Sequence, residues 1–171
     1  FSTYHWITNK NEWEAVRKDM NILPFKPTKA EIDSLEGIWL CYTGSPQARS
    51  SEPKRYHLVV LNIVEIKYRN GYFSYNRYGA GFNHTGFAQF ESPGLVSIHS
   101  RIKNQSVAIE SPRHSLMQLD HVSDFLPVIS ASWNFDVGDK NKIIGIREVY
   151  KKLSKDGSIE EVINTIRKCK L

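Results

Sequence analysis

Apolar and polar positions follow three successive patterns along the chain. Up to residue 36, and again after residue 157, apolar residues recur at the three- and four-residue spacing of helices. Between these segments, residues 38–153 form short runs rich in β-branched and aromatic side chains, separated by turn residues at regular spacing. This order predicts a mostly β protein with short N-terminal helices and a C-terminal helix.

The N-terminal segment is predicted to hold two helices. Apolar residues spaced along 11–20 indicate the first, which ends before Pro24 and Pro27. Thr28 and Glu31 then have the T-x-x-E spacing of a capping box, in which each side chain bonds the backbone of the other residue. This second, short helix leads directly into the first predicted strand.

The C-terminal segment is predicted to form a third helix. Ser158 and Glu161 repeat the capping-box spacing, and the apolar residues that follow share one helical face. We expect this helix to pack on the outside of the strands. A further strand is the alternative, because Asp156-Gly157 is also a hairpin turn.

The clearest β signal is a hairpin in the middle of the chain. The run 57–68 is rich in β-branched residues, Asn70-Gly71 is a favoured type I′ turn, and residues 72–78 return. Both faces of the run 57–68 are apolar at its centre, which indicates that both are covered. We therefore predict a single antiparallel up-and-down β-barrel of about eight to nine strands. The strands are expected at 38–43, 57–68, 72–78, 86–91, 95–103, 106–110, 116–122, 128–137 and 142–153.

The 171 residues suffice for one barrel with an additional segment at each end. The predicted organisation is an N-terminal helical arm and linker (1–36), the barrel (37–153) and the C-terminal helix (154–171). No apolar run approaches the ~18 residues of a membrane span, so no span is expected. The chain begins at Phe1, and we expect it to be part of a larger protein with sequence before this residue.

A short motif suggests how the barrel is closed at one end. Gly37 and Trp39 form a G-x-W triplet directly after the capped helix, and Arg147 lies in the last predicted strand. With the order of strands over 37–153, this arrangement resembles the calycins, the superfamily of lipocalins and fatty-acid-binding proteins. The resemblance implies a barrel able to hold a small ligand, with the Arg147 guanidinium over the Trp39 ring as a structural pair. The chain lacks the paired cysteines and the T-D-Y-type motif of classical lipocalins, so we carry over neither secretion nor their ligands.

Positive charge is concentrated on the predicted barrel. Residues 37–153 hold 14 Lys/Arg against 9 Asp/Glu, a net of +5, whereas residues 1–36 have a net of −1. Such a surface favours anionic partners, with solubility as the other explanation. The loop 44–57, at the expected mouth of the barrel, is rich in cations and serines, and arginine binds phosphate or carboxylate in a bidentate manner. We predict ligand binding here through Arg49, Lys54, Arg55 and His57; a solvated loop is the alternative.

Tyr42, Tyr75 and Arg77 complete the predicted ligand site. They lie on neighbouring strands, and aromatic rings beside cations form a recognition set for nucleotides. The same rings also fill barrel cores, and the sequence leaves the two uses open.

Enzyme chemistry has little support in this sequence. No G-x-S-x-G, H-E-x-x-H or Walker motif occurs, and the six histidines form no metal-ligand spacing with cysteine. We predict no catalytic residue, no metal and no cofactor. The two cysteines, Cys41 and Cys169, are interpreted as free thiols of a reducing compartment, so we expect a cytoplasmic location.

The sequence therefore favours a non-enzymatic ligand-binding or sensor module of a larger cytoplasmic regulatory protein. Its expected ligand is a small anionic, nucleotide-like molecule at the barrel mouth. Two alternatives stay open: a protein-interaction module with a filled barrel, and a basic nucleic-acid-binding domain.

Overall fold

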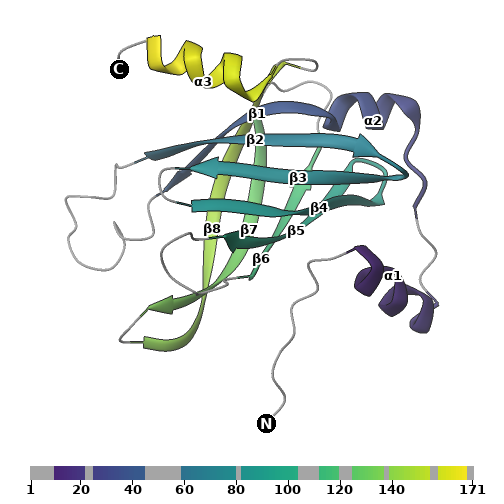
Figure 1. Cartoon of the computed structure of the whole chain (residues 1–171). Helices are drawn as coiled ribbons and strands as arrows, with labels where there is room; N and C mark the ends of the chain where they lie inside the picture. Colours follow the sequence, from purple (N-terminus) through teal and green to yellow (C-terminus); the bar gives the residue numbers. More distant parts are fainter. Residues whose placement is uncertain are drawn as a thin grey trace.

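A computed structural model of the chain describes residues 10–21, 25–44, 59–79, 82–103, 112–119, 125–136, 139–154 and 158–168. Eight antiparallel strands pair in sequence order, and the last pairs with the first, so the sheet closes into a barrel (Figure 1). The predicted up-and-down barrel is confirmed. The elements are α1 (Lys10–Asp19), α2 (Lys29–Leu35), β1 (Gly37–Gly44), β2 (Val59–Arg69), β3 (Tyr72–Gly79), β4 (Phe82–Ser92), β5 (Leu95–Lys103), β6 (Pro112–Gln118), β7 (Phe125–Asp136), β8 (Asp139–Ser154) and α3 (Ile159–Lys168).

The local signals for turns and caps are confirmed. Asn70 and Gly71 both have positive φ, 52° and 85°, as a type I′ turn between β2 and β3 requires. In the capping box of α2, Thr28 N donates to Glu31 Oε2 at 2.8 Å, and Glu31 N donates to Thr28 Oγ1 at 3.3 Å. The equivalent pair before α3 also forms, and the segment is a helix, not the alternative strand.

Two strand predictions need correction. The strand expected at 116–122 is β6, which begins four residues earlier at Pro112. Arg113 and Ser115 face the barrel interior there, so the start of β6 lacks the apolar alternation that marks a half-buried strand. The strand expected at 86–91 begins at Phe82. The strand expected at 106–110 falls outside the described residues.

The interior of the barrel has an apolar half and a polar half. Near α2, inward side chains such as Trp39, Phe73, Phe90, Met117 and Leu126 pack into one core. Farther from α2, most of the buried inward positions are polar, and Ile146 is an apolar one. The polar ones are Thr43, Asn62, Arg77, His84, Ser100, Arg113, Ser115, Ser130 and Glu148. The polar half lies at the end where β1 finishes and β2 starts.

Helix α2 closes the apolar end of the barrel. Trp39 Nε1 donates to Leu35 O at 3.1 Å, and Lys152 Nζ lies 5.2 Å from the centre of the Trp39 ring. Lys152 Nζ also donates to Asp33 O and Ser34 O at 2.8 and 2.7 Å, where the helix ends in carbonyl groups that favour a cation.

This geometry corrects the predicted pairing of Trp39 with Arg147. Along β8, residues 146, 148 and 150 are buried in the interior and residues 145, 147 and 149 are exposed. Arg147 therefore lies on the outer wall, and the cation over the indole is that of Lys152. An indole and a cation still meet at the base of the barrel, with lysine in place of arginine.

Parts of the outer wall are covered. Phe87 and His99 lie on the outward side of β4 and β5 and are nevertheless buried, with their rings stacked 4.9 Å apart. Arg17 of α1 reaches this region, 3.5 Å from Glu91 Oε2. Figure 1 draws α3 outside the barrel near β1. Within the described part of the chain, no helix has the length and apolarity that crossing a membrane requires.

Candidate ligand site inside the barrel

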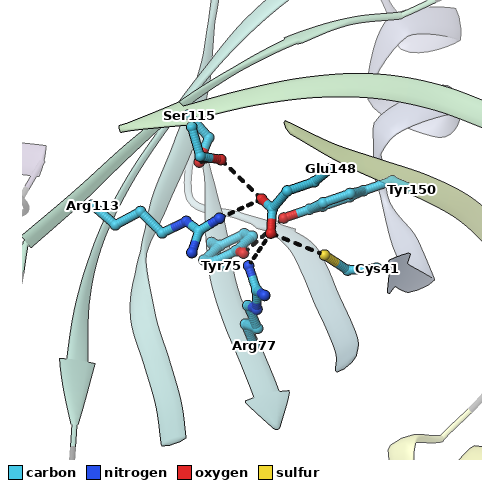
Figure 2. Close-up of polar contacts among 8 residues, drawn as sticks. Cys41, Tyr75, Arg77, Arg113, Ser115, Glu148 and Tyr150 are labelled. Atoms are coloured by element: carbon cyan, nitrogen blue, oxygen red, sulfur yellow. Dashed lines mark hydrogen bonds and ion pairs between the residues drawn. The ribbon is translucent and has the colours of Figure 1, made fainter. Parts of the chain in front are cut away.

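A buried carboxylate organises the polar half of the interior (Figure 2). Glu148 of β8 lies 2.8 Å from Arg77 Nη1 of β3 and 2.6 Å from Arg113 Nη2 of β6. It also accepts a hydrogen bond from Ser130 Oγ of β7 at 2.8 Å, and Ser130 Oγ lies 2.7 Å from Ser115 Oγ. The Glu148 side chain is fully buried and joins strands from opposite sides of the barrel.

The charge of Glu148 is set by its neighbours. Burial alone raises the pKa of a carboxyl group, because the charged form loses its hydration. Arg113 and Arg77, together with the hydrogen bond from Ser130, outweigh this effect and lower the pKa of Glu148 to about 2. Glu148 is therefore ionised at neutral pH.

Two tyrosines and a cysteine lie beside the ion cluster. The hydroxyl oxygens of Tyr75 and Tyr150 are 3.0 Å apart, and burial raises the pKa of both phenols. The Cys41 thiol donates to Glu148 Oε1 at 3.5 Å, and burial raises the pKa of this thiol to about 12. Since the thiolate is the reactive form, Cys41 is an inert thiol at neutral pH.

Besides Arg113 Nη2, which is ion-paired with Glu148, five buried polar atoms on this inner wall have no hydrogen-bond partner among the described residues. Each belongs to a side chain that is at least nine-tenths buried, and each side chain faces the interior. Arg77 lies directly opposite His84 in the β3–β4 ladder, and Ser100 lies directly opposite Arg113 in the β5–β6 ladder. The atoms are Asn62 Nδ2, Arg77 Nε, His84 Nδ1, Ser100 Oγ and Arg113 Nε.

The charges of this cluster do not cancel. Two guanidinium groups face one carboxylate, which leaves the ion cluster with one excess positive charge. Burial, and then repulsion from Arg77 and Arg113, lower the pKa of His84 to about 3, so its imidazole is neutral at neutral pH. Hydrogen-bond donors next to an excess positive charge suit an anion with acceptor oxygens.

A second polar cluster lies on the outer wall near α1. Ser97 Oγ donates to Glu91 Oε1 at 2.5 Å, and His99 Nε2 lies 3.2 Å from the same hydroxyl oxygen. A serine beside a histidine is the geometry of an activated nucleophile only when the histidine receives the hydroxyl proton. Here Glu91 accepts it, so we interpret the cluster as structural. His114 packs edge-on against His99, and the described residues contain no group of three potential metal ligands.

The predicted site residues separate into three groups. Tyr75 and Arg77 belong to the interior cluster. Tyr42 is half-buried and lies on the outer side of β1, because Cys41 and Thr43 face inward. The remaining four, Arg49, Lys54, Arg55 and His57, fall outside the described residues, so their roles stay predictions.

Sequence reasoning missed most of the cluster. Glu148, Arg113, His84 and Ser130 were not among the predicted site residues. The available signal was the alternation of β8, in which Ile146 and Tyr150 are apolar positions two residues either side of Glu148. A charged residue between two core positions indicates a buried partner of opposite charge.

Comparisons of the chain with protein-family models, with curated proteins and with solved structures found no match. The closed eight-stranded antiparallel barrel agrees with the architecture that the calycin resemblance implied.

Proposed function

We propose that this chain is a binding module for a small oxyanion, a carboxylate or a phosphate monoester, held in the polar half of the barrel. The single observation that carries the proposal is the set of five buried, unpartnered polar atoms around an ion cluster with excess positive charge. Arg77 and Arg113 offer Nε–H groups, and Asn62 and Ser100 offer further donors beside them.

The energetics favour an anionic occupant over water. A buried polar group without a partner costs about 1–3 kcal/mol, and native interiors contain few such groups. Water would satisfy the hydrogen bonds but would leave the excess charge of the two arginines uncompensated. An oxyanion satisfies both, and charge-assisted hydrogen bonds are the stronger kind.

The proposed entrance is the end of the barrel opposite α2. Gly44 and Val59 pair at this end, so the predicted cationic segment between them begins and ends beside the polar half. We propose that Arg49, Lys54, Arg55 and His57 guide the anion towards Arg77 and Arg113. In this account the calycin-like barrel serves as the sensor part of a larger cytoplasmic regulatory protein.

Calorimetric titration tests the proposal. The probes are inorganic phosphate, acetate, octanoate and adenosine monophosphate, titrated into the wild-type chain and into Arg113→Lys, Asn62→Leu and the exposed control Arg69→Lys. Lysine keeps the charge near Glu148 but has no Nε–H donor. We expect at least one probe to bind the wild type and the control, and to bind Arg113→Lys and Asn62→Leu at least tenfold more weakly.

The probes also separate the ligand classes. Preference for octanoate indicates a carboxylate on an apolar tail, and preference for adenosine monophosphate indicates the predicted nucleotide-like ligand. Binding that all variants retain equally, or no binding of any probe by a folded chain, would contradict the proposal.

A further inference from the structure

The outer wall of the barrel carries an exposed apolar area that the oxyanion site does not involve. Outward residues on β1, β2, β4 and β5, such as Ile38, Ile63, Phe87 and His99, are buried. On β6, β7 and β8 the outward apolar side chains are exposed instead, with Ile129 68% and Leu116 51% exposed. We call this area the β6–β8 face. Its apolar members are Leu116, Phe125, Pro127, Ile129, Val149 and Leu153.

The members of the β6–β8 face are neighbours in space. Leu116 lies directly opposite Ile129 in the β6–β7 ladder, and Pro127 lies directly opposite Val149 in the β7–β8 ladder. Side chains directly opposite on one face of a sheet are within contact distance. The exposed residues thus form one continuous area and are not scattered. Continuous exposed apolar areas mark interaction sites more often than single exposed residues do.

The β6–β8 face is also cationic. Arg147 lies directly opposite Ile129, and Lys151 lies opposite Phe125 with its Nζ 5.0 Å from the ring centre. No carboxylate occurs at the outward positions of β6 from 114 to 118, of β7 from 125 to 131, or of β8 from 145 to 153. The charge on this face is therefore of one sign.

We propose that the β6–β8 face binds an acidic amphipathic segment of a partner protein. Apolar side chains of the segment pack on Leu116, Ile129 and Val149, and its carboxylates pair with Arg147 and Lys151. Specific protein interfaces commonly combine apolar contacts at the centre with complementary charges around them.

The position of Arg147 favours a protein over an anionic membrane. Arg147 lies directly opposite Ile129 and two residues from Val149, near the middle of β8 and not at a loop tip. Insertion of this wall into lipid would carry the guanidinium into the hydrocarbon region at considerable cost. A protein segment, unlike the lipid hydrocarbon, can place a carboxylate beside the Arg147 guanidinium.

A peptide-display selection on the full chain tests the proposal. The probe is a library of random 16-residue peptides, and enriched peptides are measured against the wild type and four variants. We expect the enriched peptides to be amphipathic with net negative charge. Ile129→Asp and the double variant Arg147→Glu/Lys151→Glu should each bind the enriched peptides at least tenfold more weakly than the wild type does. The matched controls Met20→Asp and Arg69→Glu, at exposed positions elsewhere, should leave their affinity within twofold.

Four results would overturn the proposal. The first two are enrichment of basic peptides and the absence of any peptide whose binding depends on this face. The third is a concentration-dependent dimer, seen in sedimentation, that Ile129→Asp dissociates. The fourth is binding to phosphatidylglycerol vesicles that Arg147→Glu abolishes. The variants alter exposed side chains, apart from the half-buried Lys151, and circular dichroism establishes that they fold.

Discussion

At the scale of single residues, Glu148 decides the character of the barrel interior. A carboxylate in a closed barrel costs several kcal/mol in lost hydration unless its partners compensate it. Arg77, Arg113 and Ser130 do so within 2.8 Å, and Glu148 in turn makes two buried arginines tolerable. Because there is one carboxylate for two guanidinium groups, the same cluster that stabilises the fold retains the excess positive charge on which the proposed oxyanion site depends.

Glu148→Gln should strongly destabilise the chain, because it leaves Arg77 and Arg113 buried without a countercharge. Removing one partner of a buried ion pair costs about 3–5 kcal/mol. Urea unfolding measures the change, and Glu160→Gln on the exposed side of α3 is the matched control, expected within about 0.5 kcal/mol of the wild type. A loss below about 1 kcal/mol for Glu148→Gln would show that the ion cluster does not carry this stability.

His84 should make the fold sensitive to mild acid. Its pKa is 6.5 in the unfolded chain and about 3 in the folded barrel, so the unfolded chain binds more protons between these values. The stability that neutral His84 contributes is complete above pH 6.5 and is lost as the pH falls towards 3. Glu148, with values of 4.5 and about 2, contributes a loss only below pH 4.5.

His84→Gln isolates this contribution. Between pH 6 and 4.5, the free energy of unfolding of the wild type should fall relative to the variant by about 1.4 kcal/mol per pH unit. Urea unfolding at four pH values gives the two curves. Parallel curves would mean that His84 titrates normally in the folded chain.

At the scale of elements, α2 and β8 together close the base of the barrel. Lys152 connects them through two carbonyl oxygens of α2 and the face of Trp39. Lys152→Met should lower the free energy of unfolding by about 2–4 kcal/mol, because it removes the charged hydrogen bonds to two carbonyl groups and a cation–π contact. Arg147→Met on the outer side of β8 is the control and should change it by less than about 0.5 kcal/mol. Equal losses of unfolding free energy for the two variants would contradict the assignment of this structural role to Lys152.

Strands β4 and β5 approach closely at Gly86. A Cβ atom there would lie 1.9 Å from the backbone oxygen of His99, whereas a Cβ atom at Gly145 of β8 would meet nothing within 4 Å. Gly86→Ala should therefore cost about 1–3 kcal/mol or more through backbone displacement, and Gly145→Ala should be near neutral. Thermal unfolding of both variants checks the register of β4 against β5, and a neutral Gly86→Ala would contradict it.

The number and order of elements were predictable because they rest on local signals. Asn70-Gly71 and the Thr28–Glu31 capping box act within four residues, and both form as expected. The inward face of β8 was not predictable from such local signals, because a shift of one residue in the assumed alternation exchanges every inward residue for an outward one. The prediction that Arg147 faces inward implied that Glu148 faces outward, so the ion pairs of Glu148 with Arg77 and Arg113 were not predicted. Arg77 is 71 positions from Glu148 along the chain and Arg113 is 35, so no local pattern indicates which partners Glu148 has.

At the scale of the whole molecule, the proposed oxyanion site in the interior and the proposed docking site on the β6–β8 face lie on opposite sides of one sheet. They are separated by the thickness of that sheet, since neighbouring residues of β8 face opposite sides. We expect Ile129→Asp to leave oxyanion affinity within twofold of the wild type, because distant sites without shared partners behave additively. Calorimetry of this variant measures it, and a tenfold loss would indicate that the two sites are coupled.

The most direct measurement is the nuclear magnetic resonance of the arginine Nε–H groups in a 15N-labelled chain, with Arg77→Lys and Arg113→Lys used to assign the two signals. Titration with the oxyanion that calorimetry selects should shift the Nε–H signals of Arg77 and Arg113 to saturation, while the signal of exposed Arg69 stays in place. If both buried signals remain unchanged while the anion binds, the anion lies elsewhere, and the polar half of the barrel interior is not its binding site.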